Sequence, residues 1–174
     1  WMPEKQSLYL KATHERRKSI MKLLTPKISL LAMALLVLLT LPARAADPES
    51  VTLEMVEAWN AVDLDRVIEL FTPDGVLHSM MTEPVVGRDE LRSHLQPLFD
   101  GIEELKLNLR RTVVDGDTVI IERVDEFVFK GKRGSVPVVG VLLIRDGAVA
   151  EWREYYDRVQ LLTEMGMIAP GAAE

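Results

Sequence analysis

The sequence contains no cysteine and only three histidines, and aromatic residues make up 6% of its 174 residues. Without cysteine there can be no disulfide bond and no thiolate, so the fold must depend on a packed core. The few histidines are not grouped with acidic residues at the spacing of metal ligands. We therefore expect no metal and no other cofactor at the functional site.

Several common functional motifs are also missing. The chain has no Gly-x-Ser-x-Gly, no glycine-rich phosphate loop and no Gly-x-Gly-x-x-Gly fingerprint. Positive charge is scarce, because residues 46–174 hold 13 Lys and Arg against 25 Asp and Glu, a formal net charge of −12. Such a surface repels phosphate backbones and anionic lipids, so we expect no nucleic acid as partner and no charged membrane surface.

One segment is different, because Met21–Ala45 combines a basic start with a long apolar run. Residues 28–41 are 14 residues without a charge, and Ala43-Arg44-Ala45 follows as a small-x-small site. The run is shorter than the roughly 20 apolar residues of a membrane span and is typical of a signal-peptide core. We predict a signal peptide over residues 21–45 that is cleaved near Ala45; an uncleaved membrane anchor is the alternative.

Cleavage there would export the domain, which would be periplasmic or secreted without stable membrane association. Residues 1–20 precede the signal segment and begin with Trp1 rather than methionine. We predict that they are an upstream extension and not a native part of the protein.

The beginning of the remaining domain has the signals of helices. Asp47 followed by Pro48 opens a helix, because Asp accepts bonds from free amides and Pro suits the first helical position. Apolar residues then recur at helical spacing up to Val62, over Leu64–Phe71 and again after Gly87. We therefore expect three N-terminal helices.

The rest of the domain has the alternation that is typical of strands. The expected strands are a short one before the third helix and four after it: Val76–Met80, Leu105–Leu109, Thr118–Phe129, Val136–Arg145 and Ala148–Gln160. Asp-Gly pairs at residues 115–116 and 146–147 indicate hairpin turns. We predict an α+β domain over residues 46–165, with helices packed on one face of an antiparallel sheet, and a flexible tail over residues 166–174.

Charged residues stand inside two of these strands. Alternation places Arg123 and Asp125 on one face of the strand Thr118–Phe129, together with apolar neighbours. In the last strand Trp152, Glu154 and Tyr156 share a face that is aromatic except for the carboxylate. If both faces look inward, the arginine can bridge the two carboxylates.

An arginine between two carboxylates has a chemical consequence. The coupled titration of the pair can leave one carboxyl protonated and the other ionised near neutral pH. One acid and one base in an apolar pocket suit general acid–base catalysis on a small apolar molecule. The alternatives are a purely structural buried ion triad, or a pair that faces solvent at the sheet edge.

Three segments carry a family resemblance: ERVD (Glu122–Asp125), WREYYD (Trp152–Asp157) and LHSMMTEPVVGRDEL (Leu77–Leu91). In this order they resemble the limonene-1,2-epoxide hydrolase family, within the SnoaL-like or nuclear-transport-factor-2-like superfamily, over about residues 50–162. The resemblance implies a cone-shaped curved antiparallel sheet with three N-terminal helices on its concave face. It also implies a homodimer through the open sheet face, where the sequence offers the apolar residues Val139, Val141 and Leu143.

The resemblance further implies a one-step hydrolysis without a covalent intermediate. Glu154 would take a proton from water, Asp125 would protonate the epoxide oxygen, and Arg123 would bridge the two carboxylates. Members of the family usually have Asp at the position of Glu154, and they hold the water with a Tyr and an Asn where this chain has Leu77 and Ser79.

The predicted substrate and water pocket therefore consists of four residues: Leu77, Ser79, Trp152 and Tyr156. The departures from the family pattern leave three hypotheses open. The first is a hydrolase of a small apolar epoxide, and the second is a related isomerase or epoxide-opening cyclase. The third is a weak or inactive domain that binds a small molecule.

Overall fold

The computed structural model describes residue 16 and residues 47–169. Apart from Arg16, the predictions for residues 1–20 and 21–45 lie outside these residues, as does the prediction for the end of the tail at 170–174. The described domain is built from these elements: α2 (Pro48–Asn60), α3 (Leu64–Leu70), β1 (Phe71–Ser79), β2 (Val85–Val86), α4 (Arg88–Phe99), β3 (Ile102–Asp115), β4 (Thr118–Phe129), β5 (Lys132–Arg145), β6 (Ala148–Tyr156) and α5 (Arg158–Glu164).

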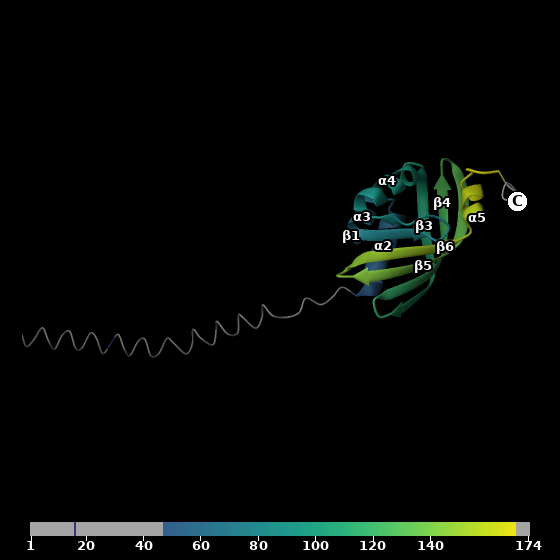
Figure 1. Ribbon diagram of the computed structural model, residues 1–174. Helices are drawn as coiled ribbons and strands as arrows, with labels where there is room; N and C mark the ends of the chain where they lie inside the picture. Colours follow the sequence, from purple (N-terminus) through teal and green to yellow (C-terminus); the bar gives the residue numbers. More distant parts are fainter. Residues whose placement is uncertain (1–15, 17–46, 170–174) are drawn as a thin grey trace, which may run out of the picture. The chain divides into compact units, whose positions relative to one another are not determined.

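The strands form one curved six-stranded sheet with the order β2-β1-β6-β5-β4-β3 (Figure 1). The hairpins β3–β4, β4–β5 and β5–β6 are antiparallel, and the Asp-Gly turns predict the first and the last of them. β1 and β6 pair in parallel, so the sheet is mixed rather than wholly antiparallel. No hairpin joins these two strands, and their relative direction is therefore set by packing and not by a turn. The predicted α+β fold class is confirmed.

The first N-terminal helix begins at the predicted capping residue, and α3 begins at a similar cap. The Asp47 side chain accepts a hydrogen bond from the Ser50 amide at 3.2 Å, and the Asp63 side chain accepts one from the Arg66 amide at 2.9 Å. Helices α2, α3 and α4 lie against the sheet (Figure 1), and their apolar side chains form one core with those of its inner face. None of the helices in the described part of the chain is long and apolar enough to cross a membrane.

The end of the domain differs from the expected long last strand. β6 stops at Tyr156, and the Asp157 side chain accepts a hydrogen bond from the Gln160 amide at 3.0 Å to begin α5. This fourth helix packs on β5, where the Lys132 ammonium donates to the Thr163 carbonyl at 2.6 Å. Alternation favoured a strand up to residue 160, but Asp157 is an ordinary helix cap and ends the strand before that residue.

The outer face of the sheet carries apolar side chains that no helix of residues 47–169 covers. Val113, Ile120 and Val141 are direct neighbours across three strands. Val113 and Ile120 are exposed and Val141 is half-buried, and the exposed apolar side chains of Val139, Leu143 and Tyr155 on β5 and β6 extend this set. The residues Val113, Ile120, Val139, Val141, Leu143 and Tyr155 are called the open-face patch below.

Candidate active site

Strand β4 carries two charged side chains into the concave face of the sheet. The Arg123 side chain is only 3% exposed and the Asp125 side chain 15%. Ile121 and Phe127 flank them on the same face and are buried in the core. The alternation of the strand therefore places the charges inward, as the sequence predicts.

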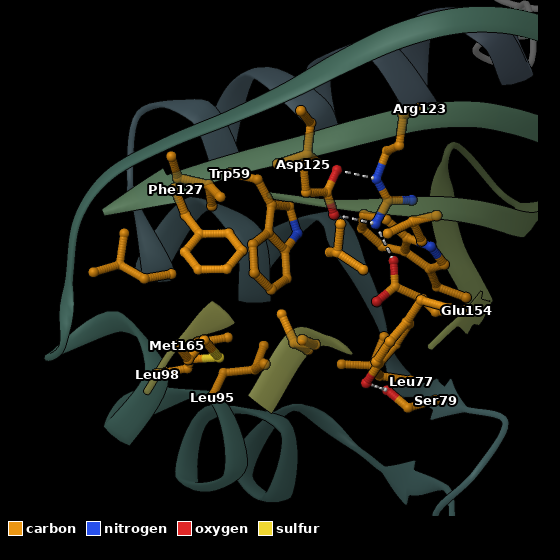
Figure 2. Close-up of a pocket in the computed structure, with 18 of the residues that line it drawn as sticks. Trp59, Leu77, Ser79, Leu95, Leu98, Arg123, Asp125, Phe127, Glu154 and Met165 are labelled. Atoms are coloured by element: carbon orange, nitrogen blue, oxygen red, sulfur yellow. Dashed lines mark hydrogen bonds and ion pairs between the residues drawn. The ribbon is translucent and has the colours of Figure 1, made fainter. Parts of the chain in front are cut away.

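Glu154 joins them from β6, with β5 lying between the two strands. Arg123 Nε donates to Asp125 Oδ1 at 2.8 Å, and Nη2 donates to Asp125 Oδ2 at 3.1 Å. Nη2 also donates to Glu154 Oε1, so one guanidinium bridges both carboxylates (Figure 2). The structure brings together the three residues that sequence alternation assigns to one site.

Gly140 of β5 makes this bridge sterically possible. It pairs with Ile121 on β4 and with Glu154 on β6, and therefore lies beneath the guanidinium. A Cβ atom at this position would lie 2.7 Å from Arg123 Nη1 and 2.8 Å from Trp152 Nε1, inside van der Waals contact. The sequence interpretation did not identify this residue, although a lone glycine within a strand is a known sign of close approach.

Burial and charge set the protonation of the triad. The pKa of Asp125 is raised to about 6: burial raises it most, the guanidinium of Arg123 opposes this, and the charge of Glu154 adds a smaller increase. For Arg123, burial alone would lower the pKa, but the charges of Glu154 and Asp125 outweigh burial and raise it. Arg123 thus stays charged, and Asp125 is available as a proton donor close to neutral pH.

The triad lines one side of a cavity with a volume of about 170 Å³. Most of the remaining wall is apolar and comes from Trp59, Leu95, Leu98 and Phe127, with Met165 after α5 (Figure 2). For comparison, an engineered cavity of about 150 Å³ in another protein takes up benzene. The arrangement offers an acid, a base and an apolar enclosure to a small molecule.

The four residues predicted to form the substrate and water pocket all line this cavity. Leu77 is 6% exposed and Trp152 is 1% exposed, so both are part of the packed wall. Ser79 pairs with Glu154 in the β1–β6 register, and its hydroxyl accepts a hydrogen bond from the Tyr156 hydroxyl at 3.1 Å. The polar residues therefore gather beside Glu154, away from the apolar end.

The sequence interpretation missed other parts of the cavity. It did not include Trp59 in the pocket; the indole packs on Phe99 and Trp152, with ring centroids at 5.0 and 5.9 Å, and it also lines the cavity. Leu161 of α5 and Met165 close one end; the sequence interpretation extended the last strand to Gln160 and expected no helix after it, so it did not include them. The Asp157 cap is the one local signal that could have found them.

The sequence of this chain is similar to those of known proteins. The sequence profile of the SnoaL-like domain matches residues 52–152. Epoxide hydrolase LasB from Streptomyces lasalocidi is 33% identical over 119 residues, which cover 65% of this chain and 42% of LasB. The chain thus spans about two fifths of the length of this curated relative.

Solved structures share the fold at lower identity. An LEH-like epoxide hydrolase from M. tuberculosis superimposes with a TM-score of 0.60 at 21% identity, covering 69% of this chain and 90% of that one. A protein with a ketosteroid isomerase-like fold from Catenulispora acidiphila, solved in complex with trimethylamine, gives a TM-score of 0.60 at 22% identity, covering 67% and 92%. At these identities the likeness establishes the architecture alone.

Proposed function

The chain belongs to the family of SnoaL-like domains, as its motifs predict, and on that premise we propose that it adds water to a small apolar epoxide in one step. The observation that carries this proposal is the Asp125–Arg123–Glu154 unit at the side of an apolar cavity. The 33% sequence identity to a protein named epoxide hydrolase supports an epoxide as the substrate.

In the proposed reaction the Glu154 carboxylate accepts a proton from a water molecule. The water oxygen attacks a ring carbon of the epoxide, and the bond between that carbon and the ring oxygen breaks. Asp125 gives its proton to the ring oxygen, which becomes the second hydroxyl of a diol. Afterwards Glu154 is protonated and Asp125 ionised, so a proton must return to Asp125 before the next turnover.

The roles of the two carboxyls follow from their surroundings. A carboxyl with a pKa of about 6 still holds a proton in a useful fraction of molecules near neutral pH, and this suits Asp125 as the acid. Arg123 keeps its charge and binds both partners, so it fixes their positions without itself transferring a proton. The apolar wall favours a hydrocarbon skeleton over a charged substrate.

The test is diol formation by the full chain, with a panel of terpene and fatty epoxides in oxygen-18 water. We expect a diol with one labelled oxygen from the unaltered chain and from Glu151→Gln, which changes the opposite face of β6. Glu154→Gln should lose the activity, because an amide cannot accept the proton at neutral pH. If no epoxide of the panel gives a diol, the proposal is wrong.

A second candidate is an isomerase or an epoxide-opening cyclase. The buried, apolar Leu77 on the cavity wall favours it, because that side chain offers a water molecule no hydrogen bond. The same acid and base would then use a nucleophile within the substrate. A product without oxygen-18 would support this candidate, whereas a ligand that raises the melting temperature without turnover would support a binding domain.

We also propose that two copies of the domain associate through the open-face patch. Its contiguous apolar side chains, of which all but Val141 are exposed, favour burial against a second, identical surface. A solution mass twice that of one chain is expected by light scattering, and a monomer at all concentrations would contradict it.

Export remains a proposal that rests on the sequence of residues 21–45. We expect a mature N-terminus close to Ala46 when the chain is expressed with an active secretion system. Mass spectrometry of the exported protein checks this; an intact N-terminal segment on exported protein would instead favour an anchor.

A further inference from the structure

The cavity wall that β1 contributes is poor in groups that could hold a water molecule. Leu77 faces the cavity and has no hydrogen-bonding atom in its side chain. Ser79 lies two residues further on and contributes one hydroxyl. One hydroxyl is a weak support for a water molecule that must be held in line with a ring carbon.

A second hydroxyl reaches the same place from β6. Tyr156 follows Glu154 by two residues, so both side chains project from the same face of the strand. Ser79 is the parallel partner of Glu154, and the Tyr156 hydroxyl donates to Ser79 Oγ at 3.1 Å (Figure 2). Two hydroxyls from two strands therefore meet next to the carboxylate that serves as base.

The hydrogen-bonding capacity of this group fits one water molecule. The single proton of the Tyr156 hydroxyl is used by Ser79, which leaves the tyrosine oxygen free to accept. Ser79 still has its own proton to donate. Arg123 occupies Glu154 Oε1, and Oε2 is left to accept from a water molecule.

We propose that Tyr156 and Ser79 hold the attacking water against Glu154, so that the hydroxyl of Tyr156 replaces the contact that Leu77 cannot make. The water donates one proton to Glu154 Oε2 and the other to the tyrosine oxygen, and it accepts the serine proton. One lone pair of its oxygen stays free and attacks the ring carbon while Glu154 takes the first proton. This assignment rests on the proposed function.

The assignment also makes the nature of the substrate more specific. The nucleophile enters from the polar side formed by β1 and β6, whereas Asp125 on β4 protonates the ring oxygen. An epoxide must therefore bind with its oxygen towards β4 and the attacked carbon towards Ser79. The carbon skeleton then extends to the apolar end near Leu161 and Met165.

The variants Tyr156→Phe and Ser79→Ala test the water site in the full chain with an epoxide that the unaltered chain hydrolyses. Each should lower kcat about tenfold to a hundredfold and leave KM within about twofold, because the loss concerns the nucleophile and not the substrate. The double variant should lose less than the product of the two single effects, because the two hydroxyls share one hydrogen bond.

Two further variants separate positioning from structural damage. Ser79→Thr keeps the hydroxyl and should retain most of kcat. Tyr155→Phe changes the neighbouring tyrosine on the open face of β6 and should leave kcat and KM unchanged. The melting temperature of each variant shows whether the fold is intact.

The outcomes separate this inference from the proposed function. No diol from the unaltered chain overturns both. Labelled diol from the unaltered chain, with full kcat in Tyr156→Phe, overturns the water site alone. Equal losses in Ser79→Thr and Ser79→Ala also overturn the role of the serine hydroxyl, and a product without oxygen-18 overturns the water site.

Discussion

The two faces of the same sheet depart from the usual pattern in opposite directions. The concave face buries charge, because Arg123 is 3% exposed and contacts two carboxylates in the core. The open face exposes apolar side chains, among them Ile120 at 38% and Val113 at 48%. Both buried charge and exposed apolar surface lower the stability of a fold. We therefore expect each face to have a function that explains why these residues are there.

The difference between the faces lies in how that disadvantage is offset. Inside, the guanidinium pairs with both carboxylates, yet a buried ion pair of this kind is seldom more stable than apolar residues of the same volume. Outside, the unfavourable exposure of the apolar patch to water could be relieved only by contact with the surface of another molecule. We therefore assign chemistry to the concave face and association to the open face.

The largest effect is expected from Asp125→Asn on the concave face. The amide cannot donate the proton that the ring oxygen needs, so kcat/KM should fall about 10²- to 10⁴-fold. Glu126→Gln is the matched control, because the next residue of β4 points to the open face and is exposed. Hydrolysis rates of both variants check this, and equal activities would remove Asp125 from the mechanism.

Arg123→Met should cause the largest loss of stability among these variants. It leaves two largely buried carboxyls without their common partner, and we expect the free energy of unfolding to fall by about 3–5 kcal/mol. Arg133→Met removes an ion pair with Glu104 whose arginine is 72% exposed, and this should change stability by about 0–1 kcal/mol. Urea unfolding compares the two, and similar losses would contradict the special role of the buried arginine.

The pH dependence of activity tests the protonation of Asp125. Its pKa is raised to about 6 in the folded protein, and in the proposed mechanism Asp125 acts only while it is protonated. Above that pH the protonated fraction falls about tenfold per unit, so kcat/KM should decline with the same slope. Initial rates between about pH 5 and pH 9 reveal this limb, and a flat profile would argue that another group supplies the proton.

Gly140→Ala should disturb the concave face without changing any charge. The added methyl group would meet Arg123 Nη1 and the Trp152 indole, and overpacking of this kind destabilises by about 1–3 kcal/mol. Activity should fall as the guanidinium moves. Ser135→Ala, at an exposed position of the same strand, is the control. Unchanged activity in both variants would show that the Arg123 side chain can accommodate the added methyl group.

The smallest effect on activity is expected from the open face. Val141→Asp places a charge in the middle of the patch, and it should convert a dimer into monomers while kcat/KM stays within about twofold. Light scattering and activity are measured on the same sample. Unchanged mass in the variant would mean that the patch is not the interface, and a large loss of activity would couple the two faces.

Much of the site follows from local pattern. Side chains in a strand alternate between two faces, so the spacing of Arg123 and Asp125 puts both on one face whatever the rest of the fold does. The aromatic neighbours of Glu154 indicate its inward direction in the same way. The capping residue Asp47 and the Asp-Gly turn at residues 146–147 likewise act within a few residues, and they place a helix and a hairpin correctly.

Other features depend on elements that are distant in the sequence. The meeting of Ser79 with Tyr156 requires β1 to lie parallel to β6, and no turn between these strands dictates that arrangement. The role of Gly140 requires the guanidinium of β4 to cross β5. No alternation pattern contains this information, because it concerns which surfaces pack together.

The sequence by itself thus determined the α+β class, the inward direction of the triad residues and the family, because alternation, caps and motifs are local or carried by contiguous segments. Only the tertiary structure decided the mixed sheet, the closing helix α5 and the pair of hydroxyls beside Glu154. These depend on contacts between segments that are far apart along the chain, and such contacts are selected by the packing of the whole core.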